Sequence, residues 1–470
     1  MNGQQTGGQP ADRQPVDGQY GAGPQVTGVR ARLRASAGHG LARVTGSALA
    51  PYQSAVVRIG IAATWLFFLL REWPHRQELY GPDGPWSWDM ARRLVSTNDA
   101  FTVLLWSDSQ AWFEFLYVFA IATSLALLAG WRTRTTSVLF MIAVLGLQNR
   151  SVFMGDGGDN VIHLMSMYLV FVRCGRVWSL DARRERRRAA ADGTGYGTGD
   201  GTDAADGTGV LLWCVLGAVL AGASAVGGFS LGWGLLFWTL WLVYGGWWML
   251  GRLAPDGEAR RVCDIVANLV HNGALLVIVV EVCLIYATAG WYKIQGSRWQ
   301  DGTATYYPMH LDYFAPWPAL NSVLAGSGLA ILLITYGTVL VQVAFPFTLF
   351  NRRVKNVLLA AMITEHLSIA VLLGLPFFSL AMITADAVFL PTAALLWLGA
   401  RASGLTARVR ARVLPGRGRA KSAGPADGAE RQEDDGPGGL AAVGFRGDRA
   451  DSADHAQQAD RADRAGRADR

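Results

Sequence analysis

Long apolar segments dominate this sequence and limit the folds that the chain can adopt. A helix needs about 20 mostly apolar residues to cross the hydrocarbon core of a bilayer, and several segments of the chain approach that length. Hydrophobic residues make up 51% of the chain and charged residues only 17%, against roughly 25% charged residues in an average soluble domain. Because so few charges cannot cover water-soluble domains, the sequence predicts an all-α, polytopic integral membrane helical bundle.

About ten of these segments are predicted to be transmembrane helices. They are the segments 54–70, 112–129, 135–149, 159–174, 210–227, 231–250, 265–289, 323–349, 356–374 and 377–398. The third and fourth segments are the shortest in strictly apolar residues, so counts of nine or eleven spans are the alternatives.

Three polar stretches flank or interrupt the apolar segments. Residues 1–50 are rich in Gly and Gln, and residues 401–470 are low in complexity and end in ADRADRAGRADR. Such compositions are typical of disordered tails. Within the predicted transmembrane domain 51–400, the stretch 182–209 has the Gly, Asp and Thr bias of a flexible linker.

The arginine residues predict how the chain is oriented in the membrane. If the N-terminus lies inside, the arginine-rich stretches 173–188, 252–261 and 352–355 all fall in inside loops, whereas the outside loops hold few basic residues and many acids. Cytoplasmic loops of membrane proteins carry an excess of Lys and Arg. The sequence therefore predicts a multi-pass protein of the plasma membrane with its N-terminus and C-terminus both cytoplasmic.

Charge and cysteine spacing bear on the partners of the chain. The net charge of +6 comes from the two tails, where it favours contact with the anionic lipid bilayer, and no nucleic acid is expected as a partner. The four cysteines show neither CxxC nor zinc-like spacing, so we expect neither a metal site nor a disulfide framework. They are Cys174, Cys214, Cys263 and Cys283.

A polar loop between the third and fourth predicted spans is the first candidate for substrate binding. The loop 148–160 concentrates Asn149, Arg150, Asp156 and Asp159 where the chain leaves and re-enters the bilayer. Its paired glycines permit a tight turn. The alternative is a purely structural turn in which Arg150 pairs with a carboxylate.

Lys293 follows the seventh predicted span, at the outer boundary of the membrane. It stands among the aromatic residues Trp291, Tyr292 and Trp299, of which Trp291 and Trp299 are also candidates for substrate binding. A lone lysine at this depth usually extends towards the headgroups. If the aromatic residues instead pack against the amine and exclude water, Lys293 becomes a usable base.

Ionisable residues inside the predicted spans are further candidates, because charge is costly in hydrocarbon. The pair Glu365–His366 in the ninth span is expected to order a pocket around Lys293. The alternative for each such residue is a satisfied polar group within the bundle. The other ionisable residues of this kind are His163, His271, Glu281 and Asp386.

Five stretches, taken together and in order, resemble one family of membrane proteins. They are WFEFLYVFAIATSLALLAGWRTRTTSVLF (112–140), NRSVFMGDGGDN (149–160), YLVFVRCGRVWSLD (168–181), AGWYKIQGSRWQDGTA (289–304) and EHLSIAVLLGLPFFSLAMI (365–383). From about Tyr52 to Leu398 the chain resembles the HTTM (horizontally transferred transmembrane) domain family. That family includes the membrane region of vitamin K-dependent gamma-carboxylase and SdpB-type bacterial membrane proteins, which take part in maturing a secreted peptide toxin.

The resemblance implies a chemistry for Lys293. In the carboxylase, a lysine in an AG-x-x-K motif before a tryptophan is the base that deprotonates vitamin K hydroquinone. Ala289, Gly290, Lys293 and Trp299 match that motif, with one extra residue between the lysine and the tryptophan. The resemblance thus implies a reduced menaquinone or vitamin K-type quinol as cofactor, and a secreted peptide or small molecule as the species modified.

Two departures from the carboxylase leave the reaction open. Where the carboxylase has a histidine near the start of the span that leads to its WS-x-D motif, this chain has Gly158-Asp159-Asn160. The carboxylase carries a large extramembrane domain after its spans, whereas this chain has only a polar tail there. A quinol-dependent enzyme is therefore one hypothesis, and a non-enzymatic transporter, immunity protein or scaffold with the same fold is the other.

Overall fold

All the regular structure that the described residues contain is helical. The computed structural model describes residues 24–191 and 207–413, and within these ranges it contains helices but no strand. The chain divides into two compact units, Met1–Thr406 and Ala407–Arg470. Every helix of the described residues lies in the first unit, apart from the last residues of α17. The prediction of an all-α fold is confirmed for these residues.

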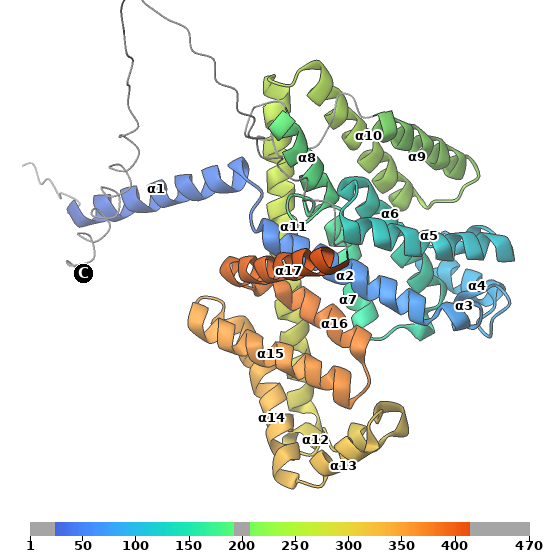
Figure 1. Ribbon diagram of the computed structural model, residues 1–470, viewed down its shortest axis with the longest axis vertical. Helices are drawn as coiled ribbons and strands as arrows, with labels where there is room; N and C mark the ends of the chain where they lie inside the picture. The colour runs from blue at the N-terminus through green and yellow to red at the C-terminus, as the bar shows by residue number, and fades with distance from the viewer. Residues whose placement is uncertain (1–23, 192–206, 414–470) are drawn as a thin grey trace, which may run out of the picture. The chain divides into compact units, whose positions relative to one another are not determined.

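Figure 1 labels the α-helices in chain order. The first nine are α1 (Pro24–Gly46), α2 (Pro51–Arg71), α3 (Arg76–Tyr80), α4 (Trp88–Asn98), α5 (Gln110–Ala129), α6 (Thr133–Arg150), α7 (Gly157–Leu169), α8 (Leu180–Ala191) and α9 (Gly207–Ala225). The remaining ones are α10 (Leu231–Leu253), α11 (Glu258–Gln295), α12 (Ser297–Gln300), α13 (Pro318–Ala325), α14 (Gly328–Ala344), α15 (Arg352–Leu372), α16 (Pro376–Asp386) and α17 (Thr392–Val413).

Six of the described helices are long and apolar enough to cross a membrane. They are α2, α5, α9, α11, α14 together with the short 3-10 turn that follows it, and α15. Each of the six coincides with a segment predicted to span the membrane. The other predicted spans fall on α6, α7, α10 and α16, and these four stay predictions.

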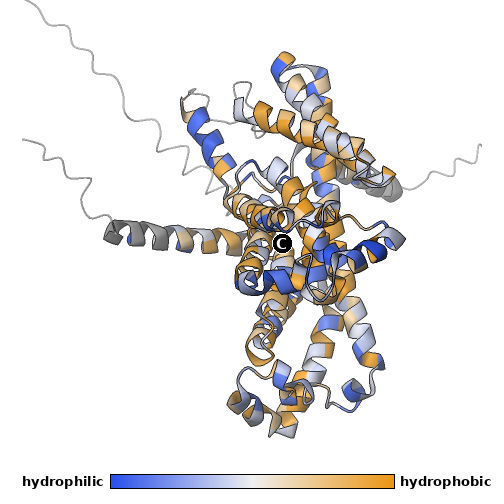
Figure 2. Cartoon of the chain, turned by 90° about the vertical axis from the view of Figure 1, so that its right-hand side faces the viewer, coloured by the Kyte–Doolittle hydropathy of each residue, from blue (hydrophilic) through white to orange (hydrophobic). Residues whose placement is uncertain are grey.

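Apolar side chains also cover outward-facing surfaces of the long helices. Figure 2 shows hydrophobic residues along most of their length, and Leu235, Leu284, Leu333 and Val357 are among the exposed ones. Soluble monomers rarely expose large contiguous apolar patches. This distribution fits helices that face lipid.

Helix α2 lies at the centre of the packing. It contacts α5 and α16, while α16 also contacts α7 and α15, and α11 contacts α14. Within the candidate span of α2, 61% of the residues are buried, against 17% for α15. The Trp65 side chain of α2 is completely buried. The core is therefore built around α2, and α15 covers it from one side.

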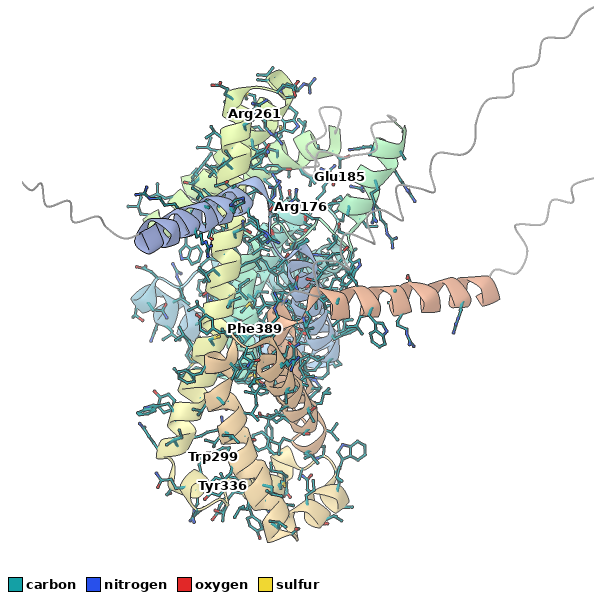
Figure 3. The ribbon with its side chains drawn as sticks, turned by 90° about the vertical axis from the view of Figure 1, so that its left-hand side faces the viewer. Arg176, Glu185, Arg261, Trp299, Tyr336 and Phe389 are labelled. Carbon is teal, nitrogen blue, oxygen red and sulfur yellow. The ribbon has the colours of Figure 1, made fainter. Side chains whose placement is uncertain are left out.

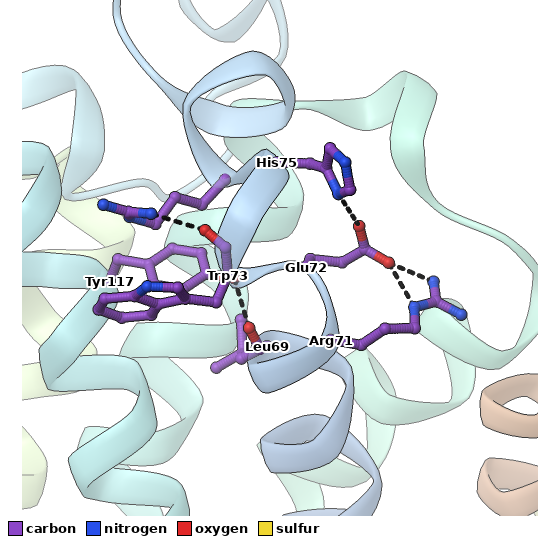
Figure 4. Close-up of polar contacts among 7 residues, drawn as sticks. Leu69, Arg71, Glu72, Trp73, His75 and Tyr117 are labelled. Carbon is purple, nitrogen blue, oxygen red and sulfur yellow. Dashed lines mark hydrogen bonds and ion pairs between the residues drawn. The ribbon is translucent and has the colours of Figure 1, made fainter.

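Hydrogen bonds fix the end of α2. The Tyr117 hydroxyl of α5 donates to the Leu69 carbonyl over 2.8 Å, and Glu72 accepts from Arg71 over 2.5 Å (Figure 4). The Arg71 guanidinium also lies 4.6 Å from the centre of the Phe377 ring on α16. These contacts hold the end of α2 against both α5 and the start of α16.

Parts of the segments predicted to be disordered or flexible are helical instead. Residues Pro24–Gly46 form α1, whose end is held to α11 because Asn268 and Asn272 donate to backbone carbonyls of Thr45 and Val44. The start of the predicted linker 182–209, up to Ala191, belongs to α8, and α17 continues past residue 400. Ala and Arg, which are strong helix formers, account for much of these stretches. The predictions are therefore wrong for these helices; residues 1–23, 192–206 and 414–470 lie outside the described residues.

Two predicted spans are divided in the structure. Ser327 caps the start of α14 by accepting from the Ala330 amide over 3.3 Å, so the segment 323–349 begins as the separate helix α13. The segment 377–398 breaks at Pro391, which has no amide hydrogen to donate. The single helices predicted over these two segments are therefore corrected to two helices each.

Candidate functional site

A chain of hydrogen bonds joins three helices at the predicted base. The Lys293 Nζ on α11 donates to the Gln342 Oε1 on α14 over 2.9 Å. The Gln342 Nε2 donates to the Glu365 Oε1 on α15 over 2.6 Å. Because a carboxylate only accepts, the amide nitrogen of Gln342 must face Glu365 and its oxygen must face Lys293. An uncharged amide thus stands between the amine and the carboxylate.

The glycine that precedes Lys293 by three residues explains why α14 comes so close. A Cβ atom built at Gly290 would lie 2.6 Å from the Cγ2 atom of Val343, the residue next to Gln342. Such a distance is a steric clash, so a larger residue at position 290 would push α14 away. Gly290 therefore allows the approach that places Gln342 within hydrogen-bonding distance of Lys293.

Of the three aromatic residues predicted near the amine, Trp299 packs against it. The Lys293 Nζ lies 5.3 Å from the centre of the Trp299 ring, within the range of a cation–π contact. Trp291 and Tyr292 are 61% and 74% exposed. Helical geometry turns side chains two residues apart to nearly opposite faces, so Trp291 does not join the site. In Figure 3 Trp299 lies near Tyr336 of α14, whose hydroxyl donates to the Gln300 carbonyl over 2.7 Å.

A second buried group of polar side chains adjoins the first. The Tyr286 hydroxyl on α11 donates to the Asp386 Oδ2 on α16 over 2.9 Å and lies 3.0 Å from the His366 Nε2 on α15. All three residues are at most 2% exposed. Because the single hydroxyl hydrogen points to Asp386, the tyrosine oxygen accepts from His366, whose Nε2 then carries the proton.

The second group also contains two polar atoms without partners. The His366 Nδ1 and the Asp386 Oδ1 are buried and make no hydrogen bond within the part of the chain that the structure describes. Glu365 and His366 are consecutive on α15, so the two groups lie side by side. Buried polar atoms are usually paired, and exceptions are common where a site binds something.

The structure therefore brings the three predicted catalytic residues to one place. Lys293 and Glu365 share the Gln342 amide, and His366 follows Glu365. Their catalytic roles stay predictions. Gln342 was not predicted, because the candidates within the spans were limited to charged residues and histidines, and Tyr286 had no predicted role. Tyr286 precedes Lys293 by seven residues and so shares its helix face, which is a signal that could have found it.

The acidic residues of the loop 148–160 cap a helix. The Asp156 Oδ1 accepts from the amides of Gly158 and Asp159 over 2.7 and 3.1 Å, and the Asp159 Oδ2 accepts from the Asp156 amide over 2.9 Å. This reciprocal pairing is a capping box at the start of α7. The two carboxylates thus have a structural task, whatever else they bind.

The other two predicted substrate-binding residues of this loop also contact backbone. The Arg150 side chain is buried, and its Nη2 donates to the carbonyls of Gly81 and Trp86, each over 2.9 Å. The Asn149 Nδ2 donates to the Phe101 carbonyl over 2.8 Å. Arg150 pairs with carbonyls, so the alternative in which it pairs with a carboxylate is wrong.

A polar cavity of about 160 Å³ lies beside this loop. It is lined by residues of α3, α6, α7 and the loop between the last two helices, and Asn149 and Asp159 are among them. Lys293, Gln342 and Glu365 belong to other helices. The predicted substrate-binding loop and the predicted base thus belong to separate groups.

Phe378 of α16 contacts both groups. Its ring centre lies 5.6 Å from that of His366. On the loop side, a Cβ atom built at Gly158 would lie 2.6 Å from the Phe378 Cα. The start of α16 therefore packs between the network on α15 and the start of α7.

Metal-ligating side chains do not cluster within the described ranges 24–191 and 207–413. No group of three or more His, Cys, Asp or Glu residues that could hold a metal ion occurs there.

No family model, curated protein or solved structure matches this chain. The membership of the HTTM family, and the quinol chemistry that it implies, therefore stay predictions that the geometry alone must support.

Proposed function

We propose that the chain is an enzyme of the plasma membrane in which Lys293 acts as a base towards a lipid-soluble quinol. The modified species would be a peptide or small molecule on the outer side. The observation that carries the proposal is the Lys293–Gln342–Glu365 chain, which holds a lysine amine within a predominantly apolar helical bundle. Ionisable groups within membrane helices are functional candidates by default.

The proposal includes a topology of about ten spans. To the six candidate spans it adds α6, α7, α10 and the pair α16–α17, each of which coincides with a segment predicted from the sequence. The arginine-rich α8 then lies in the cytoplasm and Lys293 at the outer face. Both termini are cytoplasmic, in agreement with the excess of arginine in the inside loops.

The partners of Lys293 suit an amine that accepts a proton. Its direct hydrogen-bond partner is the neutral Gln342 amide, and a lysine in apolar surroundings keeps its charge most readily beside a carboxylate. Glu365, one side chain further on, is placed to stabilise the ammonium that proton transfer would create. Trp299 covers the amine and limits the access of water. Gln342 and Glu365 are thus positioning residues, and Lys293 is the base.

A quinol fits the residues around Lys293. When bound, a reduced quinol supplies an ionisable hydroxyl and two electrons for dioxygen. Ile294 on α11 and Leu340 on α14, the helices that carry Lys293 and Gln342, are exposed apolar side chains. A lipid-soluble molecule can therefore approach Lys293 laterally, with its polar ring at the amine and its apolar tail on these residues.

The proposal is tested with the full chain in lipid nanodiscs, reduced menaquinone-4 and dioxygen. We expect quinol oxidation above that of empty nanodiscs, and a loss of at least tenfold for Lys293→Ala. The matched control is Lys355→Ala, because the Lys355 Nζ donates to a backbone carbonyl, that of Phe389. Quenching of tryptophan fluorescence by the quinol separates loss of the base from loss of binding. Equal rates for Lys293→Ala and the wild type would overturn the proposal.

A transporter is the second candidate function, and one observation favours it. The predicted tenth span is interrupted at Pro391, between α16 and α17, and the buried Asp386 is the last residue of α16. Broken helices beside buried polar groups are typical of substrate sites in transporters. Uptake of solute by proteoliposomes without any quinol would support this function, and its absence alongside quinol oxidation would exclude it.

A further inference from the structure

The polar cavity beside the start of α7 has its own chemistry, which the proposed function does not use. Three helices border it, because α3 contributes Tyr80, α6 contributes Asn149 and α7 contributes Asp159 and His163. Ser151, in the loop between α6 and α7, also lines the cavity. The hydrogen bonds around these residues determine which atoms are left to bind a ligand.

Gln148 fixes the tautomer of the neutral His163 ring. The Gln148 Nε2 donates to the Asp159 carbonyl over 3.0 Å, so its Oε1 is the atom that lies 3.0 Å from the His163 Nδ1. An amide oxygen only accepts, so the Nδ1 of His163 must carry the hydrogen. In the neutral ring the Nε2 is then an acceptor with a free lone pair.

Two more acceptors are left free by the same reasoning. The Asn149 Nδ2 donates to the Phe101 carbonyl, which leaves its Oδ1 as an acceptor. Of the two carboxylate oxygens of Asp159, Oδ2 is used by the Asp156 amide. The Asp159 Oδ1 is not used by that amide and can accept, and the carboxylate brings a negative charge to the cavity.

The Ser151 hydroxyl is a buried polar group of the cavity lining that lacks a hydrogen-bond partner among the described residues. The Ser151 side chain is only 2% exposed. Burial raises the pKa of the Tyr80 phenol well above its ordinary value, so this hydroxyl stays protonated. Neither lysine nor arginine is among the residues that line the cavity. The lining is therefore rich in acceptors and carries a single negative charge.

We propose that this cavity binds a primary ammonium group, either of a small free amine or of an ethanolamine headgroup. A primary ammonium has three N–H donors, and the free acceptors are the His163 Nε2, the Asn149 Oδ1 and the Asp159 Oδ1. An alkali or alkaline-earth cation suits the site less well, because hard cations prefer oxygen to an imidazole nitrogen. A charge-assisted hydrogen bond to Asp159 is the strongest single contact that the site offers.

Ethanolamine is the probe that tests the proposal, with choline as its matched competitor. Both carry one positive charge and a hydroxyl, but the quaternary nitrogen of choline has no N–H donor. Calorimetry on the full chain in phosphatidylcholine nanodiscs should detect binding of ethanolamine that choline does not displace. Equal binding of choline, or no binding of ethanolamine, would contradict the proposal.

Variants then locate the site. We expect Asp159→Asn to weaken ethanolamine binding at least tenfold and Ser151→Ala to weaken it severalfold, while the exposed control Asp301→Asn leaves it unchanged. Because Asp159 also caps α7, circular dichroism must show that the variant is folded; Ser151→Ala and the choline competition test the proposal independently of that cap. Unchanged affinity in both folded cavity variants would overturn it.

The source of the ammonium group is decided by the lipid. In nanodiscs that contain phosphatidylethanolamine, added ethanolamine should bind more weakly if the headgroup occupies the cavity, and with undiminished affinity if the cavity takes a free amine. Lys293→Ala should bind ethanolamine like the wild type. The site can therefore be confirmed or rejected whatever the outcome for the base.

Discussion

The Lys293 Nζ lies 2.9 Å from the Gln342 Oε1, so the direct partner of this amine is a neutral amide from another helix. The carboxylate of Glu365 is reached only through that amide. The arrangement differs from an ion pair, in which a lysine keeps its proton. It gives the amine a fixed direction while leaving it able to accept a proton.

Replacing the amide by a carboxylate should therefore impair the base. Gln342→Glu keeps the size of the side chain but places a negative charge directly against Lys293. We expect the rate of quinol oxidation in nanodiscs to fall at least tenfold, because the ion pair holds the lysine in its protonated form. Fluorescence quenching should show that the quinol still binds. A rate equal to that of the wild type would show that the neutral partner has no catalytic importance.

The Tyr286 hydroxyl should contribute to stability. Tyr286→Phe leaves His366 and Asp386 without their shared partner in the core, and an unpaired buried polar group costs about 1–3 kcal/mol. The matched control is Tyr292→Phe on the same helix, because Tyr292 is 74% exposed. Thermal unfolding in detergent should show a lower midpoint for Tyr286→Phe alone. Equal midpoints would mean that the hydroxyl is not needed.

Gly158 should tolerate no side chain. A Cβ atom there would lie 2.6 Å from the Phe378 Cα, which is backbone and cannot move aside without shifting α16. We expect Gly158→Ala to destabilise the fold by about 1–3 kcal/mol, as other overpacked cores do. Gly273→Ala, with nothing within 4 Å of the added atom, is the control and should not lose stability. If both variants unfold alike, α7 and α16 are not in close contact.

Hydropathy and helix breakers account for how much of the fold the sequence could predict. Six apolar segments are helices of spanning length, because burial of apolar residues in a bilayer demands helices. The division at Pro391 carried a visible signal that a count of apolar residues ignores. Helix α1 carried none, because its mean hydropathy is low and it is held to α11 by the amide side chains of Asn268 and Asn272.

The candidate site was less accessible to sequence reasoning. Lys293 and Glu365 are chemically conspicuous, but their connection depends on Gln342, a neutral residue that only the packing of α14 against α11 brings into place. Trp291 lies two residues from Lys293 in the sequence, but helix geometry turns its side chain away from the amine. Arg150 is equally conspicuous in the sequence, yet it binds backbone carbonyls and anchors a loop.

The most direct test observes the proton on Lys293 itself. The chain has only three lysines, Lys293, Lys355 and Lys421, so protein labelled with ¹³C at the lysine ε-carbon gives three side-chain signals, and Lys293→Arg identifies the one of interest. In anaerobic nanodiscs, we predict that this signal starts at the position of the neutral amine. It should move towards that of the ammonium when reduced menaquinone-4 is added, but not with the oxidised form. A Lys293 signal at the ammonium position from the start, or one that reduced menaquinone-4 leaves unchanged, would contradict the assignment of Lys293 as the base.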